Sequence, residues 1–394
     1  MGVNRSETTP DAVQHFPELD GIRGLAILLV LTAHAANFLN VIPLSGQPGY
    51  DSWGRLSMRV LLQGWGGVDL FFTLSGFLIT GILLRARNRN NYFSSFYARR
   101  ALRIFPIYYF VLIGTLLLMH VAGEYSFPMP KTRLEVISYF VYLPNWSVFW
   151  TGWAGLTNLL GVYWSLAVEE QFYLVWPTLI RFVNLRIMFG FCVVGFLAGW
   201  PIRFLILHHY GIVLGVLHSP VTRLDGLFLG AAIAIYRQLR GHPLPLSWAV
   251  GLFAAGCLVF LPIVFLWPNE FSGSGVHIWS AGVTGFVLLS GGLVVASHYR
   301  PRPLHAVLTL RPLLFAGRIS YGMYVYHLLI FFWLGRHMRH LYRLFHLRQT
   351  IPVAIFVYFI ALGLTAGVAS MSFYWFETPF LKLKRHFPSP AAPV

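Results

Sequence analysis

The sequence predicts an all-α integral membrane protein with about ten transmembrane helices, and three observations support this fold class. Hydrophobic residues make up 57% of the 394-residue chain and charged residues 11%, with a mean hydropathy of +0.64. Apolar runs of roughly 20 residues, the length that crosses a bilayer, recur along the chain. Basic residues cluster in short segments between these runs. We therefore expect a multi-pass protein of a cell membrane, and this charge layout argues against nucleic-acid binding.

Ten predicted spans follow one another along a single domain at residues 17–385. They cover residues 20–39, 67–84, 104–122, 163–182, 187–207, 223–239, 247–267, 278–297, 318–336 and 352–375. The segment 134–146 is too short to span and is rich in aromatic residues, so we expect it to be interfacial or re-entrant. Residues 1–16 and 386–394 are expected to be disordered tails.

The basic residues predict that both termini are cytoplasmic, because cytoplasmic loops carry an excess of Lys and Arg. The segment after the second span holds Arg85, Arg87, Arg89, Arg99, Arg100 and Arg103. With ten spans the later basic loops fall on the same side, except for 337–349, which is basic yet predicted to lie outside. Counting 134–146 as a span would invert every later loop.

A histidine, His34, lies inside the first apolar run. Arg23 precedes it by eleven positions, which on a helix is three turns plus about 20°, so the two side chains share a face about 16 Å apart along the axis. An arginine at the cytoplasmic mouth suits a phosphate, and a neutral imidazole deeper inside can take a proton from a hydroxyl. The alternatives are a core histidine held by a neighbouring helix, or a cleaved signal peptide.

Three carboxylates are predicted at a depth similar to that of His34. Asp69 lies early in the second span, and Glu169 and Glu170 lie in the fourth. Unpaired carboxylates in a membrane cost several kcal/mol, so Asp69 or a glutamate is a candidate to orient the imidazole. Adjacent residues point about 100° apart, so only one glutamate is expected to face the site directly. Each acid could instead form a buried ion pair with an arginine such as Arg223.

Three arginines, Arg99, Arg100 and Arg103, precede the third span at the predicted cytoplasmic surface. Arg99 and Arg103 are four residues apart, and with Arg23 they could form a pocket for several phosphates. No glycine-rich phosphate loop precedes them, so side chains would bind the phosphates. The alternative for each is a topology anchor or a contact with lipid headgroups.

Seven segments together resemble the ordered motif series of the membrane-bound acyltransferase-3 family, over about residues 17–380. They are "LDGIRGLAILLVLTAH", "GVDLFFTLSGFLI", "RRALRIFPIYY", "YWSLAVEEQFYLVWP", "RLDGLFLGAAIA", "ISYGMYVYHLLI" and "FETPF". The resemblance implies an enzyme of the bacterial plasma membrane that moves an acetyl or other short acyl group from cytoplasmic acyl-coenzyme A to a hydroxyl. The acceptor is implied to be a carbohydrate, an envelope glycan or a secondary metabolite.

The resemblance also implies which residues matter. The family's motif positions are matched here by Arg23, His34, Arg99, Arg100, Arg103, Trp164, Ser165, Glu169, Glu170, His327 and Glu377. His327 could form a second polar wall or be a satisfied core histidine, and pairing with one of the arginines is the simpler interpretation of Glu377.

These observations predict a mechanism in which coenzyme A, a phosphate-rich head on a thin arm, reaches from Arg23 to His34. His34 would act as general base on the acceptor hydroxyl, with acyl transfer to His34 itself as the covalent alternative. Ser75, Trp164 and Tyr326 are candidate donors to the oxyanion.

Acyl-coenzyme A is expected as a co-substrate, with no permanently bound cofactor and no metal. The sequence leaves the acceptor, the acyl length and the oligomeric state open. The competing function is a transporter or flippase with a buried polar pathway, although the two halves show no repeated pattern of broken helices.

Overall fold

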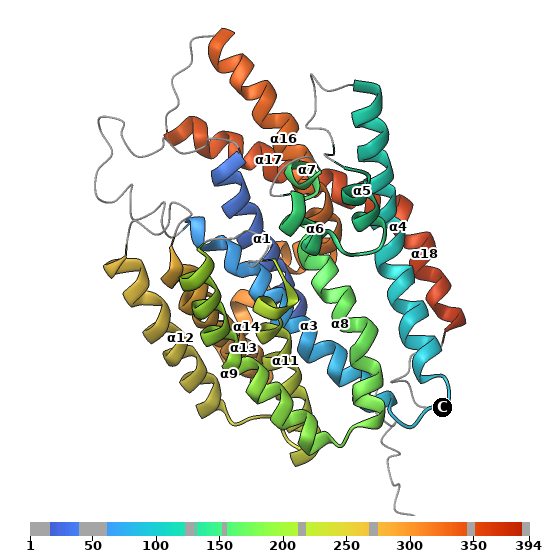
Figure 1. The fold of residues 1–394 in the computed structure, drawn as a ribbon, viewed down its shortest axis with the longest axis vertical. Coiled ribbons are helices and arrows are strands. Elements are labelled where there is room, and N and C mark those ends of the chain that lie inside the picture. Colours follow the sequence, from blue (N-terminus) through green and yellow to red (C-terminus); the bar gives the residue numbers. More distant parts are fainter. Residues whose placement is uncertain are drawn as a thin grey trace, which may run out of the picture.

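The computed structural model describes residues 16–38, 61–122, 130, 132–151, 156–211, 218–267, 275–344 and 351–387, and these residues form helices and no strands (Figure 1). The α-helices are α1 (Pro17–Phe38), α3 (Gly67–Ala86), α4 (Tyr92–Ala122), α5 (Arg133–Phe140), α6 (Pro144–Thr151), α7 (Thr157–Leu160), α8 (Tyr163–Phe182), α9 (Leu185–Tyr210), α11 (Pro220–Arg240), α12 (Leu246–Leu266), α13 (Val283–Ser297), α14 (Arg302–Leu308), α15 (Arg311–Arg318), α16 (Ser320–Leu344), α17 (Ile351–Met371) and α18 (Thr378–Lys382). Short 3-10 or π segments are η1 (Gln63–Gly66), η3 (Ile278–Gly282), η4 (Ser372–Glu377) and η5 (Leu383–His386). The predicted tails 1–16 and 386–394 lie outside the described residues, apart from 16 and 386–387.

Seven helices of the described chain are long and apolar enough to cross a membrane, and an eighth is added if a bent pair counts as one span. They cover Pro17–Ala36, Gln63–Ala86, Tyr92–Val121, Leu185–Tyr210, Leu246–Leu266, Ile278–Ser297 and Ile355–His386. The predicted count of ten is therefore not confirmed. The predicted spans 163–182 and 223–239 do form helices, α8 and α11, but both carry several charged residues and are not among the seven.

The structure shows how three predicted segments fold. The apolar run 318–336 begins at the last residue of α15 and then lies on α16, which is bent by 79° from α15. Helix α16 then continues to Leu344, so the first part of the basic segment 337–349 is helix and not loop. The segment 134–146 lies on α5 and α6, which have eight residues each and are too short to span a bilayer.

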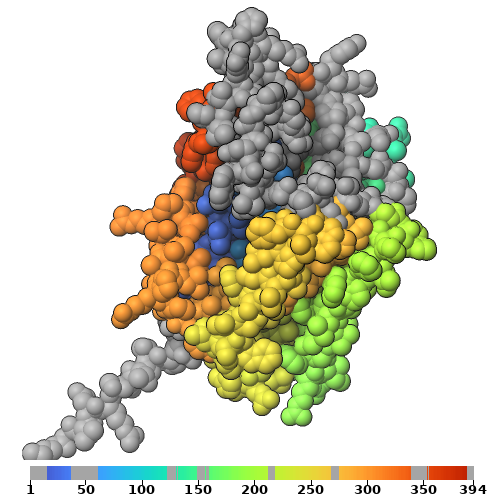
Figure 2. Space-filling model, turned by 90° about the vertical axis from the view of Figure 1, so that its left-hand side faces the viewer, coloured from blue at the N-terminus to red at the C-terminus, as the bar shows by residue number. Residues whose placement is uncertain are grey.

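Helices α1 and α3 lie at the centre of the bundle (Figure 1). Helix α3 packs against α11, which also packs against α9, whereas α1 packs against α15 and α16. The outer faces of α9 and α12 carry large exposed apolar side chains, including Phe191, Leu205, Leu258 and Phe265. Figure 2 shows α12 (yellow) and α9 (yellow-green) forming one side of the molecule, with α1 (blue) recessed behind them. Such outward apolar faces suit contact with lipid.

Glycines allow the central helices to approach backbone to backbone. A Cβ atom at Gly24 of α1 would collide with the carbonyl oxygen of Leu313 in α15, and one at Gly230 of α11 would collide with that of Thr73 in α3. Glycine is required where two backbones come this close. Because Gly24 follows Arg23 directly, the docking of α15 on α1 also sets the direction in which Arg23 points.

Candidate functional site

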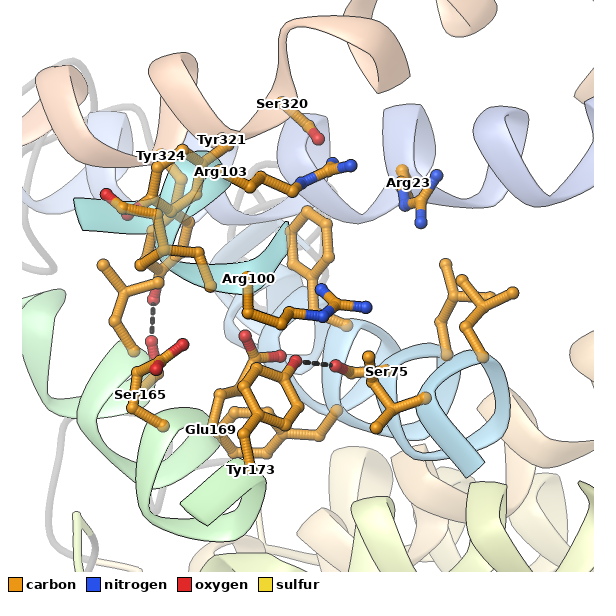
Figure 3. A pocket seen from close by; sticks show the side chains of 18 of the residues that line it. Arg23, Ser75, Arg100, Arg103, Ser165, Glu169, Tyr173, Ser320, Tyr321 and Tyr324 are labelled. Carbon is orange, nitrogen blue, oxygen red and sulfur yellow. Dashed lines mark hydrogen bonds between the residues drawn. The ribbon is translucent and has the colours of Figure 1, made fainter. Parts of the chain in front are cut away.

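A cavity of about 120 Å³ lies between α1, α3, α4, α8 and α16 (Figure 3). Its polar lining consists of Arg23, Ser75, Arg100, Arg103, Ser165, Glu169, Glu170, Tyr173, Ser320, Tyr321 and Tyr324. One water needs roughly 10–15 Å³ on this scale, so the cavity can hold several waters or a narrow chain. Because the lining is drawn from five helices, the site exists only in the assembled bundle.

One end of the cavity is strongly positive. Arg23, Arg100 and Arg103 project into the space between the helices (Figure 3), and the charge of Arg103 is repelled by those of the other two. The Arg23 Nη1 atom contacts Asp20 Oδ1 at 2.7 Å, and the Arg100 guanidinium lies 5.2 Å from the centre of the Tyr173 ring. Three guanidinium groups around one opening form an anion-binding end.

A hydrogen-bonded cluster forms the wall beneath Arg100. Glu169 is hydrogen-bonded to Ser75 and Tyr173, whose hydroxyl groups are also bonded to each other (Figure 3), and it interacts electrostatically with Arg100. Glu170 lines the cavity as well, and its buried Oε1 atom has no hydrogen-bond partner among the residues that the structure describes. Both glutamates thus line the cavity, whereas helical spacing predicted that only one would face the site directly.

A second hydroxyl pair lines the end of the cavity away from Arg23, which we call the inner end (Figure 3). The Ser165 and Tyr324 hydroxyl oxygens are 2.5 Å apart, and Ser165 also donates to the carbonyl oxygen of Val162. One turn further along α16, Nδ1 of His327 lies 2.7 Å from the carbonyl oxygen of Tyr324.

His34 and His327 form a pair next to this inner end. Nδ1 of His34 lies 3.0 Å from the carbonyl oxygen of Val30 and 3.3 Å from Nε2 of His327, which is fully buried. A carbonyl oxygen only accepts, so each Nδ1 carries a hydrogen and each Nε2 carries a lone pair. The pairing therefore assigns to His34 the tautomer whose Nε2 can accept a proton. His34 does not belong to the cavity lining.

Asp69, predicted as a partner of His34, lies elsewhere in the structure. Its Oδ1 atom is 3.4 Å from Nη2 of Arg223, and both side chains are buried. The Arg223 guanidinium also lies 5.2 Å from the centre of the Trp164 ring, and neither Asp69 nor Trp164 lines the cavity. Asp69 thus forms a buried ion pair with Arg223, the alternative to contact with His34 that the sequence left open.

Two further predicted residues contact the C-terminal segment. Arg99 donates through Nη1 to the carbonyl oxygens of Lys384 at 3.1 Å and Phe387 at 2.9 Å, and it lies outside the cavity lining. Glu377 accepts from the hydroxyl of Ser372 at 3.2 Å and interacts electrostatically with Arg103.

Tyr326 joins the same polar chain, since its hydroxyl donates to Ser372 at 3.1 Å. Neither Tyr326 nor His327 lines the cavity.

Sequence reasoning missed several tyrosines of the lining. Tyr173 follows Glu169 by four residues and so shares its helix face, a spacing that could have identified it. Tyr321 and Tyr324 belong to the same motif as His327, but only the packing of α16 against α1 and α4 shows that they face the cavity.

Comparisons with known proteins agree with one another. A family model described as an acyltransferase domain matches residues 16–372. The chain is 26% identical to the peptidoglycan O-acetyltransferase OatA of Listeria monocytogenes over 95% of this chain and 57% of the relative. It is 28% identical to the putative peptidoglycan O-acetyltransferase YrhL of Bacillus subtilis over 80% of this chain and 48% of the relative.

A putative O-acetyltransferase of Staphylococcus aureus is 26% identical over 97% of this chain and 60% of the relative. The chain thus spans about half to three fifths of the length of these curated relatives. No solved structure matches it.

Proposed function

Because the chain belongs to the acyltransferase-3 family and is an acyltransferase of the membrane, we propose that it moves an acetyl or other short acyl group from acyl-coenzyme A to a hydroxyl. The observation that carries this proposal is the convergence of Arg23, Arg100 and Arg103 at one end of a narrow cavity. A glycan or other carbohydrate is the proposed acceptor, because two relatives are named for peptidoglycan O-acetylation.

The size of the cavity supports a donor with a thin arm and a charged head. At about 120 Å³ it is smaller than the roughly 300–1,000 Å³ of pockets that enclose whole drug-sized ligands. An acyl-pantetheine arm is narrow enough to enter, and the nucleotide would stay outside. Its phosphates would then meet the guanidinium groups of Arg23, Arg100 and Arg103 through charge-assisted hydrogen bonds.

The arm would run along the Glu169 wall towards Ser165 and Tyr324. The hydroxyls of Ser75 and Tyr173 line this path, and the hydroxyls of Ser165 and Tyr324 lie at its inner end. A hydroxyl at that end can donate to the thioester oxygen as negative charge develops on it.

His34 is the proposed general base. Its Nε2 atom would remove the proton from the acceptor hydroxyl while the hydroxyl oxygen attacks the thioester carbonyl carbon. Collapse of the tetrahedral intermediate breaks the carbon–sulfur bond, and the departing coenzyme A thiolate takes the proton from His34. The His327 Nε2 atom would hold the Nδ1–H of His34 throughout. A covalent variant, with the acyl group carried by His34 itself, is the second route.

The polar residues also support the proposed topology of ten spans with cytoplasmic termini. Arg23 lies near the start of α1 and Arg100 and Arg103 near the start of α4, so the arginine end of the cavity is the end at which both helices begin. A cytoplasmic donor would enter there. Helices α8 and α11 would count as spans because their charges face protein and not lipid, as in the Asp69–Arg223 pair.

Transfer of label from acetyl-coenzyme A tests the proposal. Purified protein in lipid nanodiscs should hydrolyse the labelled thioester slowly and transfer the label to a carbohydrate acceptor. His34→Ala should reduce transfer by about 100-fold or more, since a general base contributes 10²–10⁴-fold. His208→Ala, the same change at an exposed histidine of α9, should leave transfer unchanged. Full transfer by a folded His34→Ala protein would refute the assignment of the base.

A further inference from the structure

The C-terminal helices fold back beside the arginine end of the cavity. Helix α18 and the η5 segment both contact α4 (Figure 1). Arg99 of α4 fixes this arrangement, because one of its guanidinium nitrogens donates to the carbonyl oxygens of Lys384 and Phe387. A charged donor shared between two carbonyl groups makes a strong backbone anchor.

This anchor holds one lysine among three arginines. The charges that act on the Lys384 ammonium are those of Arg103, Arg100 and Arg99, and its side chain is half-buried. Its neighbours Lys382 and Arg385 are exposed. The fold therefore holds one basic residue of this segment, half-buried, within electrostatic range of the arginines.

Positive charges held together in this way repel each other. In the described part of the chain, no carboxylate forms a salt bridge with Lys384, Arg99, Arg100 or Arg103. The acids that act on these arginines are Glu169 and Glu170 for Arg100, and Glu377 and Glu169 for Arg103. Positive charge thus exceeds negative charge at the mouth, and a bound polyanion would remove this repulsion.

We propose that Lys384 is a phosphate-binding residue at the outer rim of the cavity, and that Arg99 is the positioning residue that presents it. The inference rests on the proposed function in one respect, that the phosphate groups belong to the nucleotide end of acyl-coenzyme A. Lys384 does not line the cavity, so it suits the part of the donor that stays outside. The same chemistry is offered by an anionic lipid headgroup, and the experiment below separates the two sources.

The test uses the full chain in nanodiscs of phosphatidylcholine, with and without added phosphatidylglycerol. Binding of coenzyme A is measured by calorimetry, and transfer is measured with acetyl-coenzyme A and with S-acetyl-N-acetylcysteamine, a thioester without phosphate. Lys384→Gln should weaken coenzyme A binding and raise the KM for acetyl-coenzyme A on the order of tenfold, the effect of losing one hydrogen bond to a charged group. Its kcat, and its rate with the phosphate-free thioester, should not change.

Lys382→Gln provides the matched control, because it removes the same charge from an exposed position of the same segment. It should bind coenzyme A like the unaltered protein. Arg99→Gln should weaken binding in the same direction as Lys384→Gln, and the double variant should lose little more than either single variant.

Three results would overturn the inference. These are unchanged coenzyme A binding by Lys384→Gln, an equal loss with both thioesters, or a loss of phosphatidylglycerol binding with coenzyme A binding intact. If the unaltered protein binds coenzyme A in a Lys384-dependent way but transfers no acyl group, the phosphate site stands and the proposed function falls.

Discussion

Replacing Arg103 by Gln should weaken donor binding without slowing the chemical step. Arg103 lines the cavity and lies close enough to Arg23 and Arg100 to be repelled by both. The substitution leaves a shorter, neutral amide, so the charge and the hydrogen bonds that the guanidinium group would make to phosphate are both lost. Such hydrogen bonds contribute about 1.5–3 kcal/mol each. For one such bond at a site open to solvent on one side, we expect a KM for acetyl-coenzyme A raised about 10- to 100-fold.

The assay for Arg103→Gln is the initial rate of label transfer as donor concentration is varied, in nanodiscs and at two salt concentrations. The KM of the unaltered protein should rise with salt more steeply than that of the variant, because salt screens the attraction between Arg103 and phosphate, which the variant lacks. Arg186→Gln, the same change at an exposed arginine at the start of α9, should change neither KM nor kcat. A lowered kcat at unchanged KM would place Arg103 in the chemical step and refute this reasoning.

Two further predictions concern the buried pairs. His327→Leu removes the acceptor for Nδ1–H of His34, so kcat should fall about 10- to 100-fold at unchanged donor KM. His327→Gln should lose less kcat, because its amide oxygen can accept that hydrogen bond. Equal losses of kcat in the two variants would count against a positioning role for His327. Asp69→Leu should destabilise the protein by about 3–5 kcal/mol, because it leaves Arg223 buried without its partner. The double variant Asp69→Leu with Arg223→Met should recover most of that stability, as measured by thermal unfolding. A stable Asp69→Leu protein with a much reduced kcat would instead support a role for Asp69 beside His34.

The apolar pattern predicts the positions of the helices well, because burial in lipid demands long apolar runs. Every predicted span overlaps a helix of the structure. The number of spans is harder to predict. Helices α8 and α11 carry charges that the structure places against other side chains, as in the pairing of Arg203 with Asp225. A residue's neighbours inside the bundle decide whether its charge is compatible with a membrane, and one sequence does not reveal those neighbours.

The candidate site shows the same limit. Helical spacing places Arg99 and Arg103 on one face, and this is correct for the helix alone. Their partners differ because the C-terminal segment packs against Arg99, whereas Arg103 lies one turn further along α4 and reaches the cavity. The pairing of His34 with His327 joins positions 293 residues apart and follows from the packing of α1 against α16. No local pattern encodes either contact.

The charged residues of the bundle fall into two groups by their partners. Asp69 with Arg223, and Asp225 with Arg203, are opposite charges that neutralise each other between α3, α9 and α11. Such buried pairs hold helices in register, and removing one partner is costly. At the arginine end of the cavity, by contrast, positive charges outnumber the acids that act on them. A fold that keeps this excess at a narrow opening is suited to a ligand that brings negative charge. The contrast with the neutralised cluster around Asp69 therefore supports our proposal that the donor binds at the arginine end.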